Sequence, residues 1–392
     1  MQSKGGELPK GRNKREKILI IGGGATGSVI IRVLKLLMPR YEIICADKNP
    51  KRARMYLKGV KGIRIIKTNS SKNLYEQVKN TGILALVNAA SSTMNEPYME
   101  LALKIGAYYF DLSSYNDHKD EHLKYRKRFI KKLLRGFFDF AVAPGLTNVI
   151  VAELVDDLDR VIVKIFVMEE TKSSQTIYPW NCNLALDEAR SRVPQFINWK
   201  YKKPIEPFSK WSWHKFSNLA KMVKCFAINE NEAITLPEFL GNIKTLIVRC
   251  GGADVEALKI FVETNGDKHL TKDLYRLMSA TPTSKELDIL LKSGFVKNGR
   301  LRLDVQVEGM KEGKKVARRA WINFPTLKMF HKVLGANHVS GPSGIMAALG
   351  IVLLVECEFI DLVPPECLNA TARKFIFSRL AKMGMPIHFE IR

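Results

Sequence analysis

A run of glycines near the start of the chain is the clearest candidate for binding chemistry. Gly22-Gly23-Gly24-Ala25-Thr26-Gly27 comes directly after the apolar segment Ile18 to Ile21 and opens an amphipathic run that continues to Leu37. A strand, a glycine turn and a helix in this order form the context in which a turn binds the pyrophosphate of a dinucleotide. The sequence therefore predicts a dinucleotide site here.

Each glycine of this turn has a separate predicted role. Gly22 would permit the tight turn, Gly24 would let the backbone approach the phosphates, and Gly27 would let the helix pack on its strand. Backbone amides at the start of the helix, including those of Ala25 and Thr26, would then bind the phosphates at its positive end. The alternative is a structural turn that binds nothing.

A carboxylate follows the second predicted strand and sharpens the cofactor prediction. Asp47 lies twenty residues after Gly27, where an acid accepts hydrogen bonds from the adenosine ribose and favours NAD. Lys48, Lys51 and Arg52 follow closely and could offset a 2′-phosphate, so NADP stays possible. Asn69, after the third predicted strand, is also assigned to the cofactor.

The elements that position these residues alternate between short apolar runs and longer amphipathic ones. This alternation is typical of βα units feeding a parallel sheet, and it predicts a doubly wound Rossmann domain over residues 17–145. The expected strands are Ile18–Ile21, Tyr41–Ala46, Ile63–Lys67, Ile83–Ala89, Tyr108–Leu112 and Phe138–Ala141. The expected helices are Ala25–Leu37, Pro50–Lys58, Asn73–Asn80, Met94–Ile105 and His118–Leu134. The Pro144-Gly145 turn predicts the domain boundary.

Beyond residue 145 the pattern changes to longer alternating strands, which predicts an α+β domain with a mixed or antiparallel sheet over residues 146–340. Expected strands are Val161–Met168, Thr245–Cys250, Arg300–Glu308 and Lys314–Asn323, and expected helices are Asp187–Arg192, Val255–Glu263 and Lys285–Leu291. Pro194 to Asn218 is aromatic and basic and is expected to be irregular. Residues 341–392 should form a helical segment that packs back on the Rossmann domain, with Ile345–Val355 as a buried helix too short to cross a bilayer.

Composition limits the function without choosing it. The chain has 392 residues, 46% of them hydrophobic and 26% charged, which is typical of a globular protein of two domains. Its formal net charge of +24 would attract anions. No aromatic-interleaved basic element or reader motif accompanies the charge, so a solvated basic surface, including a flexible tail over residues 1–16, is favoured over nucleic acid as a partner.

The cysteines and the first residues favour the cytoplasm. The six cysteines show no paired spacing, so we predict neither a metal site nor a disulfide framework. The polar first residues cannot act as a signal peptide, and no membrane partner is expected.

The sequence resembles the saccharopine dehydrogenase-like family, which includes saccharopine reductases, lysine dehydrogenases and carboxynorspermidine dehydrogenases. The resemblance runs from Lys17 to nearly the end of the chain. It rests on segments whose order and spacing match: Ile18–Gly27, Val87–Ala90, Tyr109–Ser113, Ala143–Asn148, Glu232–Pro237, Gly341–Gly344 and Val363–Glu366.

The resemblance implies hydride transfer at the carbon–nitrogen bond of an imine or secondary amine in an amino-acid-derived substrate. It implies that Asn88, Ala89 and Ala90 line the nicotinamide side of the cofactor. The residues implied to face the substrate are Gly145, Thr147, Asn148, Trp180 and Glu232.

The reaction also needs a group that moves a proton near the nitrogen. Asp111 and Tyr115, at the end of the fifth predicted strand and just past it, are candidates by position. Asp111 could instead bond backbone amides in a polar turn, and Tyr115 could be a buried aromatic. Asn148 could cap the helix that follows it, and Trp180 could fill the core instead of lining a pocket.

Two positions depart from the family pattern and change the charge expected in the pocket. Glu230 stands where many members carry histidine, and Glu238 stands where an arginine is expected. Arg249, Lys221 and Lys224 could bind a substrate carboxylate.

We expect the oxidoreductase to be a homodimer, because dimers are common among such two-domain enzymes. Two further functions stay open. One is a homologue that binds the dinucleotide without turnover. The other is a synthase that uses NAD transiently, as homospermidine synthase does.

Overall fold

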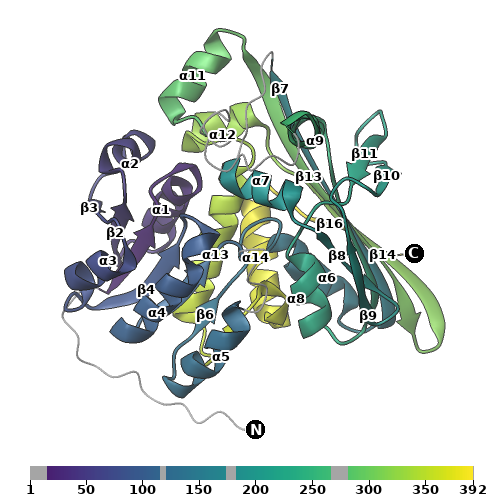
Figure 1. Cartoon of the computed structure of the whole chain (residues 1–392), viewed down its shortest axis with the longest axis horizontal. Helices are drawn as coiled ribbons and strands as arrows, with labels where there is room; N and C mark the ends of the chain where they lie inside the picture. Colours follow the sequence, from purple (N-terminus) through teal and green to yellow (C-terminus); the bar gives the residue numbers. More distant parts are fainter. Residues whose placement is uncertain (1–15, 115–120, 174–181, 266–280, 392) are drawn as a thin grey trace.

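The computed structural model describes residues 16–114, 121–173, 182–265 and 281–391. Two sheets dominate the fold, one parallel and one mixed, with helices between and around them (Figure 1). The predicted fold class, a Rossmann domain followed by an α+β domain, is confirmed.

The first sheet is parallel throughout and has the order β15-β6-β5-β4-β1-β2-β3. Its strands are β1 (Lys17–Ile21), β2 (Glu42–Asp47), β3 (Arg64–Lys67), β4 (Ile83–Asn88), β5 (Tyr108–Asp111), β6 (Gly136–Phe137) and β15 (Leu362–Val363). β2 and β3 lie on one side of β1, and β4 lies on its other side, so the order of the strands switches between β1 and β4. The carboxyl ends of these two strands form the crevice where such folds bind dinucleotides.

Both faces of this sheet are buried, which explains why its strands read as unbroken apolar runs. On β1, Ile18 and Ile20 face one hydrophobic core, and Leu19 and Ile21 face another. The first core includes residues of α1 (Ala25–Leu37) and α13 (Ser340–Glu356). The second includes residues of α3 (Ser71–Val78), α4 (Asn95–Ile105) and α5 (Glu121–Lys131). Two short helices, α2 (Pro50–Tyr56) and η1 (Ser92–Met94), follow β2 and β4.

The second sheet follows the path β10-β11-β12-β7-β13-β14-β16, with β8 and β9 attached beside β12. Its strands are β7 (Asp159–Ser173), β8 (Val193–Ile197), β9 (Lys200–Ile205), β10 (Trp211–His214), β11 (Val223–Phe226), β12 (Ile243–Gly251), β13 (Val296–Lys311), β14 (Lys314–Asn323) and β16 (His388–Ile391). The sheet is mixed because β7 runs parallel to β12 and antiparallel to β13.

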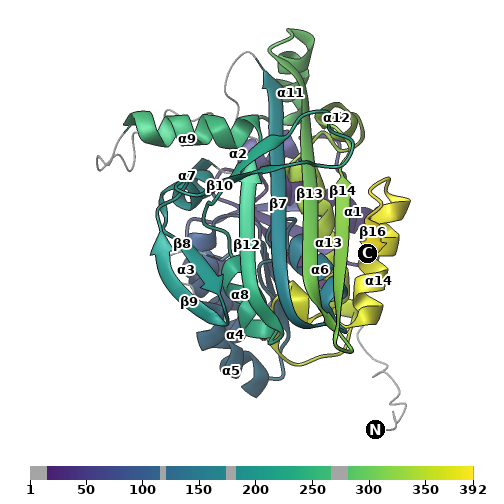
Figure 2. The ribbon, with the colours of Figure 1, turned by 90° about the vertical axis from the view of Figure 1, so that its right-hand side faces the viewer.

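Helices cover one face of this second sheet, and the long strands lie in front of them in Figure 2. Alternate residues of β7, from Val161 to Val167, point into the shared core. The remaining helices are α6 (Leu146–Val155), α7 (Cys182–Arg190), α8 (Glu232–Phe239), α9 (Ala253–Asn265), α11 (Ser284–Lys292), α12 (Leu327–Leu334), η2 (Pro365–Cys367) and α14 (Ala370–Lys382).

The last fifty residues join both sheets. α13 packs against α1 so closely that a Cβ on Gly344 would lie 2.5 Å from the Cβ of Val29. β15 then extends the Rossmann sheet beside β6, and β16 pairs with β14 at the edge of the second sheet. The expected buried helix at Ile345–Val355 lies within α13. In the described ranges, no helix combines the length and apolar character needed to span a membrane.

Two predictions about elements were wrong. The segment Pro194 to Asn218 is not irregular, because it contributes to β8, β9 and β10, whose pairing partners lie far away in the sequence. The sixth strand is Gly136–Phe137 and not Phe138–Ala141. The missing side chain of Gly136 explains that shift, since Leu362 of the neighbouring strand occupies the space where its Cβ would lie.

Candidate active site

A single cavity of about 890 Å³ runs from the glycine turn to the inner face of the second sheet. Ten of the predicted cofactor residues line it: Gly22, Gly24, Ala25, Thr26, Asp47, Lys48, Asn69, Asn88, Ala89 and Ala90. Residues of β7, α7 and β12 close its far end. The cavity thus lies between a nucleotide-binding crevice and a second domain, the usual place for such sites.

The glycine turn leaves room at the position where a dinucleotide needs it. A Cβ on Gly27 would lie 1.9 Å from the carbonyl oxygen of Gly22, and a Cβ on Gly22 would meet the backbone of Ala89. A Cβ on Gly24, by contrast, would meet nothing within 4 Å. Gly22 and Gly27 therefore allow the turn to pack, while Gly24 opens the backbone to the cavity, so the residues present fit a bound pyrophosphate.

Asp47 is held at the edge of the cavity by two backbone amides. Gly23 N donates to its Oδ2 at 2.7 Å, and Asn49 N donates to its Oδ1 at 2.7 Å. Each carboxylate oxygen can accept a further hydrogen bond, so these contacts hold Asp47 in place and leave it able to accept from a ligand.

Asn88 shapes the loop at the middle of the cavity. Its Nδ2 donates to the Ser91 carbonyl at 2.9 Å and to Asn95 Oδ1 at 2.8 Å, while its Oδ1 accepts from Ala90 N at 3.1 Å. These bonds fix the Ala89-Ala90 backbone that lines the cavity, where the resemblance implies the nicotinamide.

Three carboxyl groups, which we call the cavity acids, lie at the end of the cavity formed by the second domain: Glu169, Glu188 and Glu230. Glu169 ends the inward-facing row of β7, and Glu188 belongs to α7. Glu230 accepts a hydrogen bond from Cys250 Sγ at 3.1 Å. In contrast, Glu169 Oε2 is buried with no hydrogen-bond partner. Lys48, at the opposite end, is the cationic side chain among the described lining residues.

Burial and mutual repulsion change the protonation of the cavity acids. Burial, assisted by the negative charge of Asp254, raises the pKa of Glu169 to about 8. Burial also raises the pKa of Glu188 and of Glu230 well above the ordinary value, with further contributions from neighbouring carboxylates. Near neutral pH this end of the cavity therefore holds protons on its carboxyls, and it would favour a cation that could replace them.

Asp111 lies in a separate set of buried side chains, the junction network, which consists of Asp111, Ser114, His122, Asp139 and Asn231. Asp111 is 1% exposed and does not line the cavity. Its Oδ2 lies 2.6 Å from His122 Nε2, and its Oδ1 accepts from the Asp139 amide at 2.9 Å. The second contact is the bond to a backbone amide, the alternative to a catalytic role that the sequence left open for Asp111.

The junction network continues across the domain boundary. Ser114 Oγ donates to Asp139 Oδ1 at 2.8 Å, and Asn231 Nδ2, from the second domain, donates to the same oxygen at 3.3 Å. Burial would lower the pKa of His122, but the charge of Asp111 and its hydrogen bond raise it to about 9. His122 and Asp111 therefore form a buried ion pair.

Four residues expected to face the substrate lie instead inside the protein. Thr147, Asn148 and Glu232 have no exposed surface, and neither they nor Gly145 line the cavity. Thr147 Oγ1 donates to Glu232 Oε1 at 2.7 Å. Gly145 N donates to Asn148 Oδ1 at 2.9 Å, which is the helix-capping role for Asn148. These side chains link α6 to α8 and hold the two helices together.

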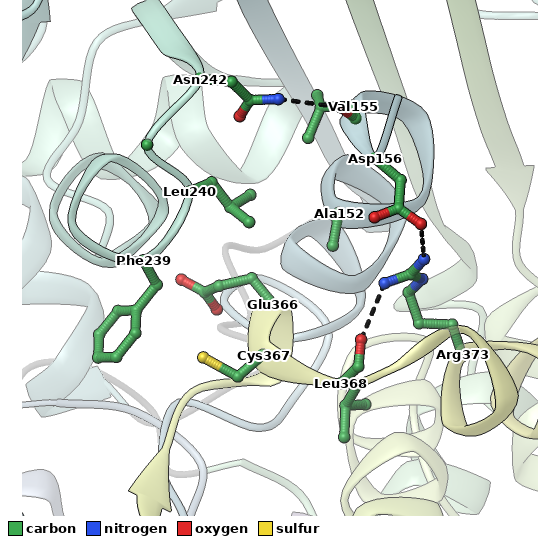
Figure 3. A pocket seen from close by; sticks show the side chains of 11 residues that line it. Ala152, Val155, Asp156, Phe239, Leu240, Asn242, Glu366, Cys367, Leu368 and Arg373 are labelled. Atoms are coloured by element: carbon green, nitrogen blue, oxygen red, sulfur yellow. Dashed lines mark hydrogen bonds and ion pairs between the residues drawn. The ribbon is translucent and has the colours of Figure 1, made fainter. Parts of the chain in front are cut away.

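The C-terminal segment meets the same junction from the outside. Asn148 Nδ2 donates to Glu366 Oε2 at 3.0 Å. A smaller cavity of about 430 Å³ opens beside Glu366, where Arg373 donates to Asp156 at 2.6 Å and to the Leu368 carbonyl at 2.9 Å (Figure 3). The landmark Val363–Glu366 thus belongs to a contact between α6, α8 and the C-terminal segment.

The remaining candidates are distributed differently. Tyr115 and Trp180 lie outside the described residues, so their roles stay predictions. Glu230 lines the cavity, whereas Glu238 is exposed on α8. Arg249 points its guanidinium to the Val248 carbonyl, and the Lys224 ammonium lies 4.2 Å from the centre of the Trp211 ring. Neither they nor Lys221 line the cavity.

Sequence reasoning missed Glu169, Glu188 and Cys250, although the pattern held a signal for each. Glu169 continues the period-two apolar row that starts at Val161, and Cys250 continues the corresponding row of β12. Glu188 lies four residues after Leu184, on the same side of α7, and both line the cavity. An acidic residue at a position of the alternating pattern that is otherwise apolar indicates a buried site.

Comparison with protein families now agrees with the geometry. Residues 18–133 match the family model for the saccharopine dehydrogenase NADP binding domain. The Rossmann domain of this chain is therefore similar to the NADP-binding domain of saccharopine dehydrogenases. Comparison with curated protein sequences gives no significant match.

Two solved structures share the fold of this chain. Saccharopine dehydrogenase (L-Glu forming) from Saccharomyces cerevisiae has a TM-score of 0.67 at 10% identity, over 96% of this chain and 100% of that chain. Homospermidine synthase from Legionella pneumophila, in complex with NAD, has a TM-score of 0.70 at 12% identity, over 96% of this chain and 92% of that chain. At these identities the two structures show the fold alone. The family model and the turn geometry together show that residues 18–133 form an NAD(P)-binding domain.

Proposed function

We propose that this protein is an NAD(P)-dependent oxidoreductase that transfers hydride at the carbon–nitrogen bond of an amine or imine substrate. The observation that carries the proposal is the position of the cavity acids at the end of the cofactor cavity. Three carboxyls without a cation among their described neighbours form a site for a positively charged nitrogen. An amino-acid-derived amine, the class implied by the resemblance, meets this requirement through its nitrogen.

The cavity acids supply the two functions that the substrate nitrogen needs. Their raised pKa values mean that a neutral ligand meets protonated carboxyls, whereas an ammonium ion favours the carboxylates and binds to them. When C=N forms from CH–NH, one proton must leave the nitrogen, and a carboxylate beside it can accept that proton. Of the three, Glu188 and Glu230 are our candidates for this base.

The rest of the cavity positions the reactants. A bound dinucleotide supplies the hydride acceptor or donor at its nicotinamide ring. Gly24 lets the backbone approach the phosphates, Asp47 accepts from the ribose, and Asn88 fixes the loop on which the ring would lie. The apolar residues Val167, Leu184 and Ile228 limit water near the reacting carbon.

The test is a search for turnover with the full-length protein. Lysine-, ornithine- and polyamine-derived amines are supplied with NAD or NADP, and the formation of reduced nicotinamide is followed. Steady reduction with a cationic amine and none with the matching alcohols is the expected result. Product without net reduced cofactor would indicate a synthase, and cofactor binding without any product would indicate a non-catalytic homologue.

A pair of variants tests the assignment of the cavity acids. Glu230→Gln should lower kcat/KM by about a hundredfold or more, because general acid–base groups contribute at least that much. The affinity for NAD(P) should not change. Glu238→Gln, an exposed acid eight residues away, is the matched control and should behave as the wild type. Equal activity in both variants would refute the role of Glu230.

A further inference from the structure

Arg52, one of the basic residues that could bind a 2′-phosphate, does not line the cavity and is engaged across the domain boundary. Arg52, on α2 of the Rossmann domain, donates from Nη1 to Glu286 Oε1 at 3.1 Å and from Nη2 to Glu286 Oε2 at 3.2 Å. Its Nη2 also donates to the Thr281 carbonyl at 3.3 Å. Both ends of the guanidinium fork are thus occupied by the second domain.

Glu286 is held in place independently of Arg52. It is the third residue of α11, and its Oε2 accepts from the Thr283 amide at 2.7 Å. Its own amide donates to Thr283 Oγ1 at 3.4 Å, which completes a capping box. The start of α11 therefore holds the Glu286 carboxylate in place whether or not Arg52 binds to it.

This contact lies beside the adenosine end of the cofactor cavity. Tyr56, one turn after Arg52 on α2, donates its hydroxyl to the Thr281 carbonyl. Both Tyr56 and Thr281 line the cavity, together with Asp47 and Lys48. Arg52 itself is connected to Asp47 through the helix cap, because Asn49 accepts from the Arg52 amide and donates its own amide to Asp47.

We propose that Glu286 is a specificity-determining residue that makes the site select NAD over NADP by holding Arg52 away from the 2′-position. NADP differs from NAD by a dianionic phosphate on the adenosine ribose, which proteins of this fold accept by means of a nearby arginine. Here that arginine is paired with Glu286, and the carboxylates of Asp47 and Glu286 both repel the added phosphate. The inference concerns only the dinucleotide and does not depend on the proposed amine reaction.

Direct binding measurements on the full-length protein test this inference. The dissociation constants of NAD and NADP are measured by calorimetry for wild type and for Glu286→Gln. Glutamine keeps an oxygen for the Thr283 amide but removes the charge that holds Arg52. NADP should bind about tenfold tighter or more, while the affinity for NAD changes less than about threefold.

Two further variants separate selectivity from a general change in charge or stability. Asp288→Asn removes an acid from the same helix, where it pairs with Lys292 and not with Arg52, and should not alter the NADP to NAD ratio. In an Arg52→Gln background, Glu286→Gln should lose its effect on NADP, because the freed guanidinium is absent.

Three outcomes would overturn the inference. These are an unchanged ratio in Glu286→Gln, an equal change for both cofactors, or the same gain in Asp288→Asn. Each of them can be seen without any turnover, so it is distinguishable from a failure of the proposed function.

Discussion

The junction network and the cavity acids are two groups of polar side chains inside the protein that differ in whether a cationic partner lies beside them. In the junction network, Asp111 uses both carboxylate oxygens, one toward His122 and one toward a backbone amide. Among the cavity acids, Glu169 Oε2 is buried without a partner. Asp139 Oδ2 in the junction network is also buried without a hydrogen-bond partner, but that network contains the cationic His122. Lys48, the cationic side chain among the described residues that line the cavity, lies at the end opposite the cavity acids.

The difference indicates which acids serve the fold and which serve a ligand. A buried charge with a fixed counterion and hydrogen bonds can be kept permanently, whereas an unpaired one costs stability and is retained where a ligand completes it. Asp111, our first candidate for catalysis, has the surroundings of a structural residue. Glu169 and Glu188 have those of a binding site.

The glycine turn also contains one residue that serves the fold, Gly27, and one that leaves room for a ligand, Gly24. Replacing Gly24 gives the largest expected effect. Gly24→Val should abolish cofactor binding, with a loss of about a hundredfold or more, because the new side chain fills open space that the phosphates need. The variant should keep the melting temperature of the wild type, because a Cβ there meets nothing within 4 Å. Calorimetry with NAD and a thermal melt measure the two properties.

Gly27→Val is the matched variant on the packed side of the turn. It should fail to fold or lose most of its stability, because the carbonyl oxygen of Gly22 would lie 1.9 Å from its Cβ. If Gly24→Val bound NAD normally, the position of the pyrophosphate would have to be revised.

Stability should separate the two groups of acids directly. Asp111→Asn should lower the free energy of unfolding by about 3 to 5 kcal/mol, because it leaves the His122 charge buried without its partner. Glu169→Gln should leave that free energy unchanged or raise it, because no partner is lost. Urea denaturation in the absence of ligands measures both.

Activity should show the opposite order. Glu169→Gln should impair turnover of a cationic amine more than Asp111→Asn does, when both are assayed at a temperature where they are folded. An Asp111→Asn protein that is fully stable yet inactive would return Asp111 to the catalytic candidates.

The smallest expected effect is a difference in pH dependence. The pKa of Glu169 rises from 4.5 to about 8, so the folded protein keeps a proton that the unfolded chain releases, and stability falls as pH rises through this window. The pKa of His122 rises from 6.5 to about 9, so its contribution is complete below 6.5 and is lost as pH rises through 9. Burial also raises the pKa of Asp139 to about 8 and that of Glu366 to about 7. Melting temperatures measured from pH 5 to about 9 should therefore decline continuously, with Glu169 and His122 each contributing part of the decline.

Variants measure the two contributions. Glu169→Gln and His122→Gln should each make the decline of the melting temperature with pH shallower. An unchanged decline in Glu169→Gln would mean that other buried acids, such as Glu366 or Asp139, carry it.

The sequence predicted the cofactor half of this protein well, since local signals determine it. The glycine turn, the buried strands and Asp47 follow rules that act within about thirty residues, and the helix Ala25–Leu37 occurs with its predicted bounds. Asn88, Ala89 and Ala90 also line the cavity, and their place beside the nicotinamide stays a prediction.

The substrate half was predicted less well because pairing over long distances determines it. Thr147, Asn148 and Glu232 lie close together, as expected for one site, but they bond to one another and do not line the cavity, although Glu232 Oε2 has no hydrogen-bond partner. Whether an acid such as Glu188 faces a cavity or solvent depends on which elements pack around α7, and its neighbours come from β7 and β12. Hydrophobic periodicity could flag these acids as unusual, but it could not bring them together.

The pairing of β15 with β6 has a consequence for biosynthesis. The Rossmann sheet gains its edge strand only when Leu362 and Val363 pair with Gly136 and Phe137, about 220 residues earlier in the chain. At a synthesis rate of roughly 5 to 20 residues per second, the edge at β6 would stay uncovered for about ten to fifty seconds on the ribosome. The strand that completes the nucleotide-binding domain is therefore made long after the rest of its sheet. A fragment that ends at the domain boundary would carry an open sheet edge and an uncovered α1.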